Sequence, residues 1–413
     1  MAGVGGAGGA GGAGGAGGAG GAGGAGIRPG GASPGTSGLE AGAEPYGGVT
    51  HYSGQMSSGI IVAGDGIAGP WDSAAIQHFD NPDPNAKDAT GAFAPHDHMA
   101  LWSPWVRSFL LKNEVLSRLV VIQKTTAPGG NPNVSAEIFH MAQDGRIMPK
   151  FTGQSLMKFT RPTADVFRAQ LEFVRDYADL RSDRFAEVHS QIGYPVPYFG
   201  TILSLHPERN RYTLEFLAIG LAISSIMSMR IKHALMCTRP DHYSAQVMPM
   251  IPTPGHGTLP GAHSVEAFLA AEILSSIAGL APSDPRRKLL LRQAARISDN
   301  RVVAGVHFPA DSMAGMALGQ TLAEYLMRRA GFKRSLLAGW SGSNDVDGVE
   351  FDGRAIVGDY TLSGLIETGA HADRGKRISD PDQGITLRAF PTAVFEKSDP
   401  LAWLLRQAQA EWS

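Results

Sequence analysis

The sequence predicts a mainly α-helical protein: a helical bundle with a disordered Gly-rich N-terminus and a loop-rich C-terminal extension. Three observations predict it. Between residues 161 and 332, apolar side chains recur at helical spacing over several long stretches. The first 26 residues are mostly Gly-Gly-Ala repeats, and after Gly331 the sequence changes to Gly- and Asp-rich turns. With 413 residues and 43% hydrophobic content, the chain can bury one large core or two smaller ones.

The N-terminal part divides into two predicted segments. Residues 1–48 are dominated by Gly, Ala, Pro and Ser, so they have little to bury and are expected to be disordered. Residues 49–160 are expected to form a loop-rich N-terminal part of the domain. Within them His96, Asp97 and His98 fit a solvated loop better than a metal site, because no further ligands follow at a suitable spacing.

Residues 161–332 form the predicted helical catalytic core. Gly279 suits a position just past a helix C-terminus and Pro309 suits a first helical turn, so both mark helix ends. In chain order, the predicted helices lie within Thr163–Ser190 and at Tyr212–Met236, Ser264–Ala278, Asp284–Ser298 and Ala310–Arg329.

Residues 333–413 form the predicted C-terminal extension. It contains short β-like runs, among them Gly384–Arg388, and a final helix near Pro400–Glu411. The extension could cover an active-site mouth or mediate oligomer contacts, and the sequence does not choose between these roles. Its acidic cluster fits a solvated turn better than a calcium loop, because the spacing does not match. The cluster consists of Asp345, Asp347, Glu350 and Asp352.

The first cationic cluster lies at the end of the helical run Tyr212–Met236. Lys232 and Arg239 are seven residues apart, so two helical turns would bring both side chains to nearly the same face. Pro240 disfavours the helical conformation of Arg239, so the helix should end there. Arginine offers a rigid fork of donors to an oxyanion, and lysine adds a mobile point charge.

The second cluster is Pro260-Gly261-Ala262-His263, where a Pro- and Gly-rich loop turns into an apolar helical stretch. Backbone N–H groups without partners at such a helix start attract anions. His263 stands at this start, and the ordinary histidine pKa near 6.5 suits proton transfer at neutral pH.

The third cluster contains Arg301, His307 and Asp311. Since Pro309 suits the first turn of the following helix, His307 is expected just outside that helix with its ring accessible. Asp311 is close enough in sequence to orient the ring.

Together the three clusters place two arginines, a lysine and two histidines beside stretches that look buried. Such groups are costly to bury without a partner, and an oxyanion such as phosphate or vanadate would be that partner. The alternative is that the cations cap helix ends or form surface pairs and that the histidines are satisfied core groups. That alternative does not explain why the three clusters occur together in this order and at this spacing along the chain.

Lys232-x6-Arg239-Pro240, Pro260 to His263, and Arg301-x5-His307-x3-Asp311 resemble the three-part signature of a known superfamily. It unites type 2 phosphatidic acid phosphatases, bacterial acid phosphatases and vanadium-dependent haloperoxidases. The resemblance implies that Lys232, Arg239 and Arg301 hold the equatorial oxygens of the bound anion. It also implies that His307 is the axial group, as the phosphorylated nucleophile of a phosphatase or the single protein ligand of vanadium, and that His263 is the general acid and base.

Two motifs depart from the family pattern. The second normally reads Pro-Ser-Gly-His, so Gly261 lacks a hydroxyl that would donate to the anion, at a cost of about 1.5–3 kcal/mol in binding. Ser264 or Thr258 could partly replace it. Ala262 keeps its backbone N–H, although a positive φ there would cost roughly 1–2 kcal/mol. Asn300 stands where the family usually has serine, and asparagine can still donate.

Within the superfamily, the sequence favours a haloperoxidase-like branch that oxidises halide, with bromide favoured, by hydrogen peroxide at a histidine-ligated vanadate cofactor. One reason is the long sequence before the signature. The other is His256, four residues before Pro260, because bromide-using haloperoxidases resemble this chain in placing a histidine near the vanadate. The alternatives are an acid phosphatase without cofactor that hydrolyses phosphomonoesters through a phosphohistidine, and a catalytically impaired relative that binds an anion.

Composition limits the remaining partners. A net charge of −2 and an isoelectric point near 6.7 argue against a nucleic-acid partner. The longest uncharged apolar run, Phe216–Met229, is shorter than the about 18–20 residues of a membrane span, so a soluble protein is expected. No secretory signal is visible, and the expected localisation is cytoplasmic or unknown. The single cysteine, Cys237, excludes an internal disulfide. Homo-oligomerisation is left open.

Overall fold

The computed structural model describes residues 97–126, 133–143, 151–193, 195–281, 283–332, 348–356, 358, 362, 384–388 and 395–413. The segment 1–48, expected to be disordered, lies outside these residues. So do His96 of the candidate metal loop, Asp345 and Asp347.

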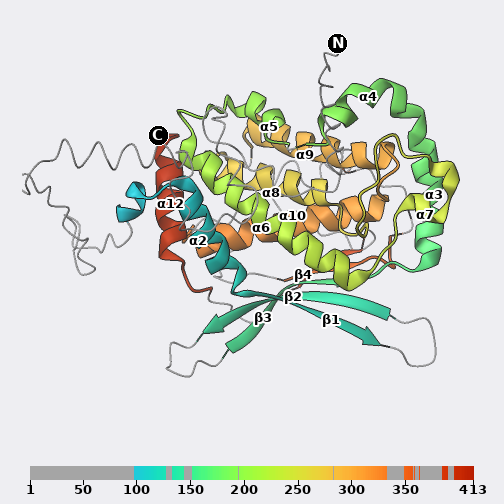
Figure 1. Ribbon diagram of the computed structural model, residues 1–413, viewed down its shortest axis with the longest axis horizontal. Coiled ribbons are helices and arrows are strands. Elements are labelled where there is room, and N and C mark those ends of the chain that lie inside the picture. The colour runs from blue at the N-terminus through green and yellow to red at the C-terminus, as the bar shows by residue number, and fades with distance from the viewer. Residues whose placement is uncertain are drawn as a thin grey trace, which may run out of the picture.

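The described residues are mostly helical, as the sequence predicts (Figure 1). Short 3₁₀ turns at Asp97–Leu101, Tyr177–Leu180 and Ala245–Val247 link some of the helices. In chain order, the α-helices are α2 (Pro104–Leu116), α3 (Ala164–Asp176), α4 (Arg181–Ser190), α5 (Val196–Leu203), α6 (Arg211–Leu235), α7 (Pro240–Tyr243), α8 (Ala262–Ile277), α9 (Pro285–Val303), α10 (Pro309–Arg329) and α12 (Asp399–Ala410).

Helices α6, α8 and α10 pack side by side in the middle of the bundle (Figure 1). Two glycines bring the backbones of α8 and α10 into contact. A Cβ atom at Gly315 would lie 2.6 Å from the carbonyl oxygen of Gly261, and one at Gly319 would lie 2.4 Å from that of Val265. A larger residue at either position would push the helices apart. This close approach fixes the start of α8, which carries the second motif, against the start of α10, which carries the third.

A five-stranded sheet covers one side of the bundle, with the strand order β1-β2-β3-β4-β5. Neighbouring strands are antiparallel except for the parallel pair β3 and β4. In one face of β2, the alternating residues Val134, Ala136, Ile138 and His140 are buried. The strands are β1 (Leu119–Thr126), β2 (Asn133–Gln143), β3 (Phe151–Thr160), β4 (Gly348–Asp352) and β5 (Ile385–Arg388).

Residues 49–160 were expected to be loop-rich, and the described part of that segment holds helix α2 and three strands that the sequence did not predict. The alternation in β2 is the pattern that indicates a half-buried strand.

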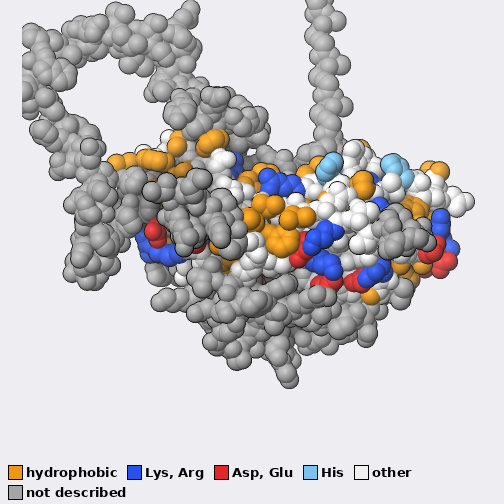
Figure 2. Space-filling view, turned by 90° about the horizontal axis from the view of Figure 1, so that it is seen from below, with side chains coloured by type: hydrophobic (Ala, Val, Ile, Leu, Met, Phe, Trp, Pro, Cys, Tyr) orange, Lys and Arg blue, Asp and Glu red, His pale blue; other side chains and the backbone are white. Residues whose placement is uncertain are grey.

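Seen from below, the described part of the molecule carries basic and acidic side chains beside apolar ones, so this face is not uniformly basic (Figure 2).

The C-terminal extension contributes to the bundle and to the sheet. The predicted β-run contains β5, and the predicted final helix is α12. Glu350 pairs with Lys158 at 2.8 Å and lies in strand β4 rather than in a calcium loop. The carboxylate of Glu411, just after α12, accepts hydrogen bonds from the backbone N–H groups of Tyr212 and Thr213 at 2.8 and 2.9 Å. It thereby caps α6, whose far end carries Lys232.

One stretch of the described residues, Arg211–Tyr243, is long and apolar enough to cross a membrane by length and composition. Its longest uncharged run is still Phe216–Met229. Since 67% of its most apolar window is buried inside the protein, and buried core helices meet the same criteria, it is weak support for a membrane span.

Candidate active site

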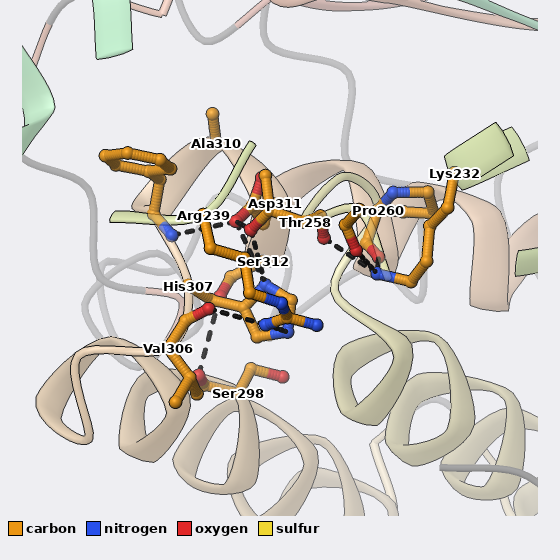
Figure 3. Close-up of polar contacts among 12 residues, drawn as sticks. Lys232, Arg239, Thr258, Pro260, Ser298, Val306, His307, Ala310, Asp311 and Ser312 are labelled. Atoms are coloured by element: carbon orange, nitrogen blue, oxygen red, sulfur yellow. Dashed lines mark hydrogen bonds and ion pairs between the residues drawn. The ribbon is translucent and has the colours of Figure 1, made fainter. Parts of the chain in front are cut away.

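The three motifs meet where the C-terminal end of α6 lies beside the N-terminal ends of α8 and α10 (Figure 3). Their functional side chains come from four helices and two loops and are buried or half-buried. They are Lys232 in the last turn of α6, Arg239 before α7, His256 in the following loop, Gly261, Ala262 and His263 at the start of α8, Arg301 near the end of α9, and His307 and Asp311 at the start of α10.

Asp311 fixes the tautomer of His307. The Nδ1 atom of His307 lies 3.0 Å from Oδ2 of Asp311. The same oxygen accepts hydrogen bonds from the hydroxyl of Thr258 and, at 2.8 Å, from the backbone N–H of Phe308. An ionised carboxylate can only accept hydrogen bonds, so Nδ1 of His307 must carry the proton that points at Asp311. The lone pair is therefore on Nε2, the atom that can act as a nucleophile.

Arg239 contacts that lone pair. Its Nη1 atom lies 3.4 Å from Nε2 of His307 and donates to the carbonyl oxygen of Val306 at 2.7 Å. The sequence prediction that Lys232 and Arg239 share one helical face is wrong. Helix α6 ends at Leu235, Met236 takes a left-handed conformation with φ of 52°, and Arg239 is extended. The chain therefore brings Arg239 back to the site through a turn.

The ammonium group of Lys232 binds the loop of residues 257–260. Its Nζ atom donates to the carbonyl oxygens of Gly257 at 3.0 Å, Thr258 at 2.8 Å and Pro260 at 2.6 Å (Figure 3). An ammonium group has three protons, so these bonds use all of them. To hold an equatorial oxygen, as the resemblance implies, Lys232 would have to give up one of the three carbonyls. Burial and the neighbouring Arg239 lower the pKa of Lys232 to about 7, an effect that Asp311 opposes.

The guanidinium of Arg301 is buried and only partly hydrogen-bonded within the described part of the chain. Its side chain is only 1% exposed. Nη2 donates to the carbonyl oxygen of Val188 at 3.0 Å and to Oε1 of Gln191 at 3.3 Å, whereas Nε and Nη1 have no hydrogen-bond partner among the described residues. Burial lowers the pKa of Arg301 to about 10, so the group stays charged at neutral pH. Buried cationic donors without partners are costly, and an oxyanion would satisfy them.

Both histidines of the motifs, His263 and His307, are neutral at neutral pH. Burial and the neighbouring Arg301 lower the pKa of His263 to about 3, although backbone hydrogen bonds with Gln191 and Ile192 oppose this. Burial and the cations around it, Arg239 foremost, hold the pKa of His307 well below 6.5. Burial raises the pKa of Asp311 to about 6, against its hydrogen bonds with Thr258 and Phe308, so this carboxylate is ionised at pH 7.

The second-motif departures are accommodated locally. Gly261 caps α8 with φ of −67°, and Ala262 begins the helix, so no positive φ burdens the alanine. Ser264 carries a hydroxyl close to the position of the missing one. Its Oγ atom is buried, has no partner in the described part of the chain, and lies 3.4 Å from where a Cβ atom at position 261 would be. Thr258 does not play this part, because its hydroxyl is engaged by Asp311.

His256 lies at the rim of the site. Its Nδ1 atom is 3.2 Å from Nη2 of Arg239, and its carbonyl oxygen accepts from Nε of Arg239 at 3.0 Å. With Lys232 and Arg239 it lines a pocket of about 510 Å³ beside the anion site. His256 therefore holds Arg239 and lines this pocket with it.

Two functional neighbours were not predicted from the sequence. Gln170 of α3 is fully buried, and its Oε1 atom accepts from the backbone N–H of Ala310 at 3.1 Å, which anchors the start of α10. Gln191 contacts Arg301 from the turn after α4. Neither lies in a motif, and a single glutamine carries no spacing signal that would have revealed it.

Comparison with known proteins agrees with this geometry. Residues 213–334 match the PAP2 superfamily, a range that includes the residues of all three motifs. Decaprenylphosphoryl-5-phosphoribose phosphatase from Mycobacterium tuberculosis, in the strains CDC 1551 / Oshkosh and ATCC 25618 / H37Rv, is 30% identical over 118 residues. The aligned part is 28% of this chain and 60% of the relative, so the chain spans less than two thirds of that protein's length.

Among solved structures, a transmembrane PAP2 type phosphatidylglycerolphosphate phosphatase from Bacillus subtilis has 18% sequence identity and a TM-score of 0.32, over 40% of this chain and 86% of that chain. These values are too low to support an argument. The Mycobacterium tuberculosis relative is a phosphatase and does not support the haloperoxidase-like branch expected from the sequence. Residues 213–334 of the chain are therefore similar to the PAP2 superfamily, and a phosphatase is among the proteins that the chain resembles.

Proposed function

We propose that this protein is a phosphatase that hydrolyses phosphomonoesters through a phosphohistidine on His307. The observation that carries the proposal is the placement of two groups in one buried site. The Nδ1 atom of His307 is held by Asp311, which leaves Nε2 as a nucleophile, and the guanidinium of Arg301 has donors without a hydrogen-bond partner in the part of the chain that the structure describes. Phosphate is the ligand that satisfies such donors and reacts with such a nucleophile.

In the proposed reaction, the phosphate group of the substrate binds to Arg301, to Arg239 and to the backbone N–H groups at the start of α8. Arg239 moves its contact from Nε2 of His307 to a phosphate oxygen. Nε2 then attacks phosphorus, and the bond from phosphorus to the ester oxygen breaks. The departing oxygen takes a proton from His263, and Asp311 stabilises the positive charge that develops on the His307 ring.

The second half of the reaction reverses these roles. Neutral His263 takes a proton from water, the water oxygen attacks phosphorus, and the bond to Nε2 of His307 breaks, which releases phosphate. For the first half His263 must be protonated, although its pKa is about 3 in the anion-free protein. A bound phosphate dianion would raise this pKa by placing negative charge beside the ring. Substrate binding would therefore favour the protonated form of His263 that the first half of the reaction needs.

Halide oxidation at vanadate is the second candidate. His307 and the donors of Arg301 fit vanadate as they fit phosphate, and vanadate bound there would supply the peroxide chemistry. The observation in favour is His256, which stands beside Arg239 at the pocket. The phosphatase relatives weigh against it.

One experiment separates the candidates. Purified protein is assayed for release of p-nitrophenol from p-nitrophenyl phosphate and, after incubation with orthovanadate, for bromination by bromide and hydrogen peroxide. The proposal predicts phosphate ester hydrolysis that vanadate inhibits and that His307→Ala abolishes. Vanadate-dependent bromination without ester hydrolysis would establish the second candidate instead. Loss of both activities with vanadate still bound would identify an anion-binding relative.

A further inference from the structure

A segment outside the three motifs also builds the site. It is the end of α4 and the turn that follows, Val188–Ile192. The carbonyl oxygen of Val188 and the side chain of Gln191 accept from Arg301. Backbone hydrogen bonds with Gln191 and Ile192 also act on the ring of His263. One short segment therefore contacts both the main phosphate-binding cation and the proposed acid.

The amide of Gln191 has one orientation that fits its neighbours. The side chain is 1% exposed. Oε1 accepts from Nδ2 of Asn300 at 2.9 Å and from Nη2 of Arg301 at 3.3 Å, and Nε2 donates to the carboxylate of Glu187 at 3.1 Å. A flipped amide would set its NH₂ group against two donors and its oxygen against a carboxylate, which is unfavourable at every contact.

The partners of Gln191 are themselves fixed. Arg184 donates from Nη1 to Oδ1 of Asn300 at 3.0 Å, so Nδ2 of Asn300 must face Gln191. The carboxylate of Glu187 accepts from Nε of Arg296 at 3.0 and 3.1 Å and from its Nη2 at 2.9 Å. These contacts form a continuous polar network from the surface of α4 and α9 to the buried Arg301. Every member has its donor or acceptor role set by the next.

The consequence is a fixed rotation of the Arg301 guanidinium. An arginine side chain has five N–H bonds. The two on Nη2 are used by Val188 and Gln191, which leaves those on Nε and Nη1 for a ligand. Without Gln191 the guanidinium would lose one of the two acceptors that hold it and could turn away from the anion.

We propose that Gln191 is a positioning residue for phosphate binding by Arg301, and that Asn300 acts through Gln191 rather than on the anion. This rests on the proposed phosphatase function for its kinetic consequences, but not for anion binding. It also explains how the chain carries asparagine where the family usually has serine. The two ends of the Asn300 amide join Arg184 to Gln191, which a serine hydroxyl is too short to do.

The test compares Gln191→Ala and Gln191→Glu with the wild-type protein, and uses Gln246→Ala, at an exposed position outside the network, as the control. Binding of orthovanadate and of inorganic phosphate is measured by calorimetry from pH 5 to pH 8, alongside kcat and KM for p-nitrophenyl phosphate and the melting temperature. Gln191→Ala should weaken binding of both anions roughly tenfold, the effect of one lost hydrogen bond to a charged group. Gln246→Ala should leave binding unchanged.

Gln191→Glu gives the readout that a merely structural role would not move. At pH 8 the carboxylate would pair with Arg301 and repel the anion, so binding should be weaker than in Gln191→Ala. At pH 5 a protonated carboxyl has one donor and one acceptor, like the amide, and the adjacent Glu187 favours that protonation. Binding relative to wild type should therefore recover towards pH 5. Asn300→Ser should weaken binding in wild type and add little to Gln191→Ala.

The outcomes separate the two proposals. Anion binding that depends on residue 191 in a protein without phosphatase activity would keep this inference and overturn the proposed function. Full activity with wild-type anion binding in Gln191→Ala, or no recovery of Gln191→Glu at low pH, would overturn this inference alone. If the alanine variant does not fold, the glutamate variant at pH 5 and pH 8 decides. A wild-type protein that binds neither anion would overturn both.

Discussion

The Nδ1 atom of His307 lies 3.0 Å from the Oδ2 atom of Asp311, one helical turn away at the start of α10. Proline at position 309 starts the helix and leaves His307 just before it, as the sequence predicts. Because Asp311 also accepts from Thr258 and from the backbone of Phe308, its carboxylate cannot rotate away. This pair keeps the proton on Nδ1 and the lone pair on Nε2, the atom that attacks phosphorus in the proposed reaction.

Asp311→Asn tests this pair. The amide would keep the shape of the side chain but could place its NH₂ group against Nδ1 of His307, which favours the wrong tautomer. We expect kcat for p-nitrophenyl phosphate to fall roughly 10²- to 10⁴-fold with little change in melting temperature. Asp165→Asn, an exposed position in α3, is the control. Activity within threefold of wild type would show that Asp311 does not set the tautomer.

Moving one hydroxyl tests the second motif. Ser264→Ala should weaken orthovanadate binding by about 1.5–3 kcal/mol, since it removes the hydroxyl next to position 261. Adding Gly261→Ser to that variant should restore most of the affinity. The backbone at 261 allows serine, although its Cβ would lie a tight 3.2 Å from the carbonyl oxygen of Asp311. Ser276→Ala, whose hydroxyl bonds within α8, is the control.

That prediction is contradicted if Ser264→Ala binds vanadate like wild type, or if the double variant binds no better than the single one. Gly261→Ser alone should raise vanadate affinity and activity.

His263 should take up a proton when the anion binds. Its pKa is about 3 in the anion-free protein, so the ring is neutral at pH 6, and a bound oxyanion raises this pKa. Calorimetric titration with orthovanadate at pH 6, in buffers of different ionisation enthalpy, should therefore show net proton uptake. His263→Gln should abolish that uptake while the fold is retained. Equal uptake in both proteins would show that another group gains the proton.

Glu266 gives a test that does not depend on catalysis. This carboxyl is buried one turn after His263, and burial raises its pKa to about 7. A folded-state pKa above the unfolded value of about 4.5 means that ionisation costs stability as pH rises from 4.5 to 7, and the full cost is present above pH 7. Glu266→Gln should therefore raise the free energy of unfolding by on the order of 3 kcal/mol at pH 8 and by little at pH 4.

Chemical denaturation at the two pH values measures this difference, with Glu208→Gln at an exposed position as the control. A pH-independent effect of Glu266→Gln would mean that the carboxyl keeps an ordinary pKa in the folded protein.

The sequence predicts the helices well because they are long apolar stretches with marked ends, such as Gly279 after α8 and Pro309 at the start of α10. The predicted run Tyr212–Met236 and the observed α6 differ by one residue at each end. Strands β1 to β3 were missed, although every second residue of β2 from Val134 to His140 is buried. Of these strands only β3 pairs with β4, which follows almost 190 residues later, and pairing at that distance is not visible in local pattern.

At the site, the three motifs identify the residues but not their contacts. Lys232 was expected to hold the anion, yet three loop carbonyls take its protons. That result depends on the path of residues 257–260, which sequence spacing does not specify. Arg239 was predicted on the same helical face as Lys232 because no local sequence signal shows that α6 ends at Leu235 and that Met236 is left-handed. Gln191 acts through a fold-dependent contact, so no motif contains it.

Trapping of the covalent intermediate tests the central claim most directly. His263→Ala is mixed with p-nitrophenyl phosphate, whose leaving group needs no proton, so His307 should still be phosphorylated while hydrolysis of the intermediate is slow. After alkaline quenching, which preserves phosphohistidine, peptide mass spectrometry should find one phosphoryl group on His307 and none in the His263→Ala, His307→Ala double variant. A phosphoryl group on another residue, or ester hydrolysis that continues without His307, would contradict the account.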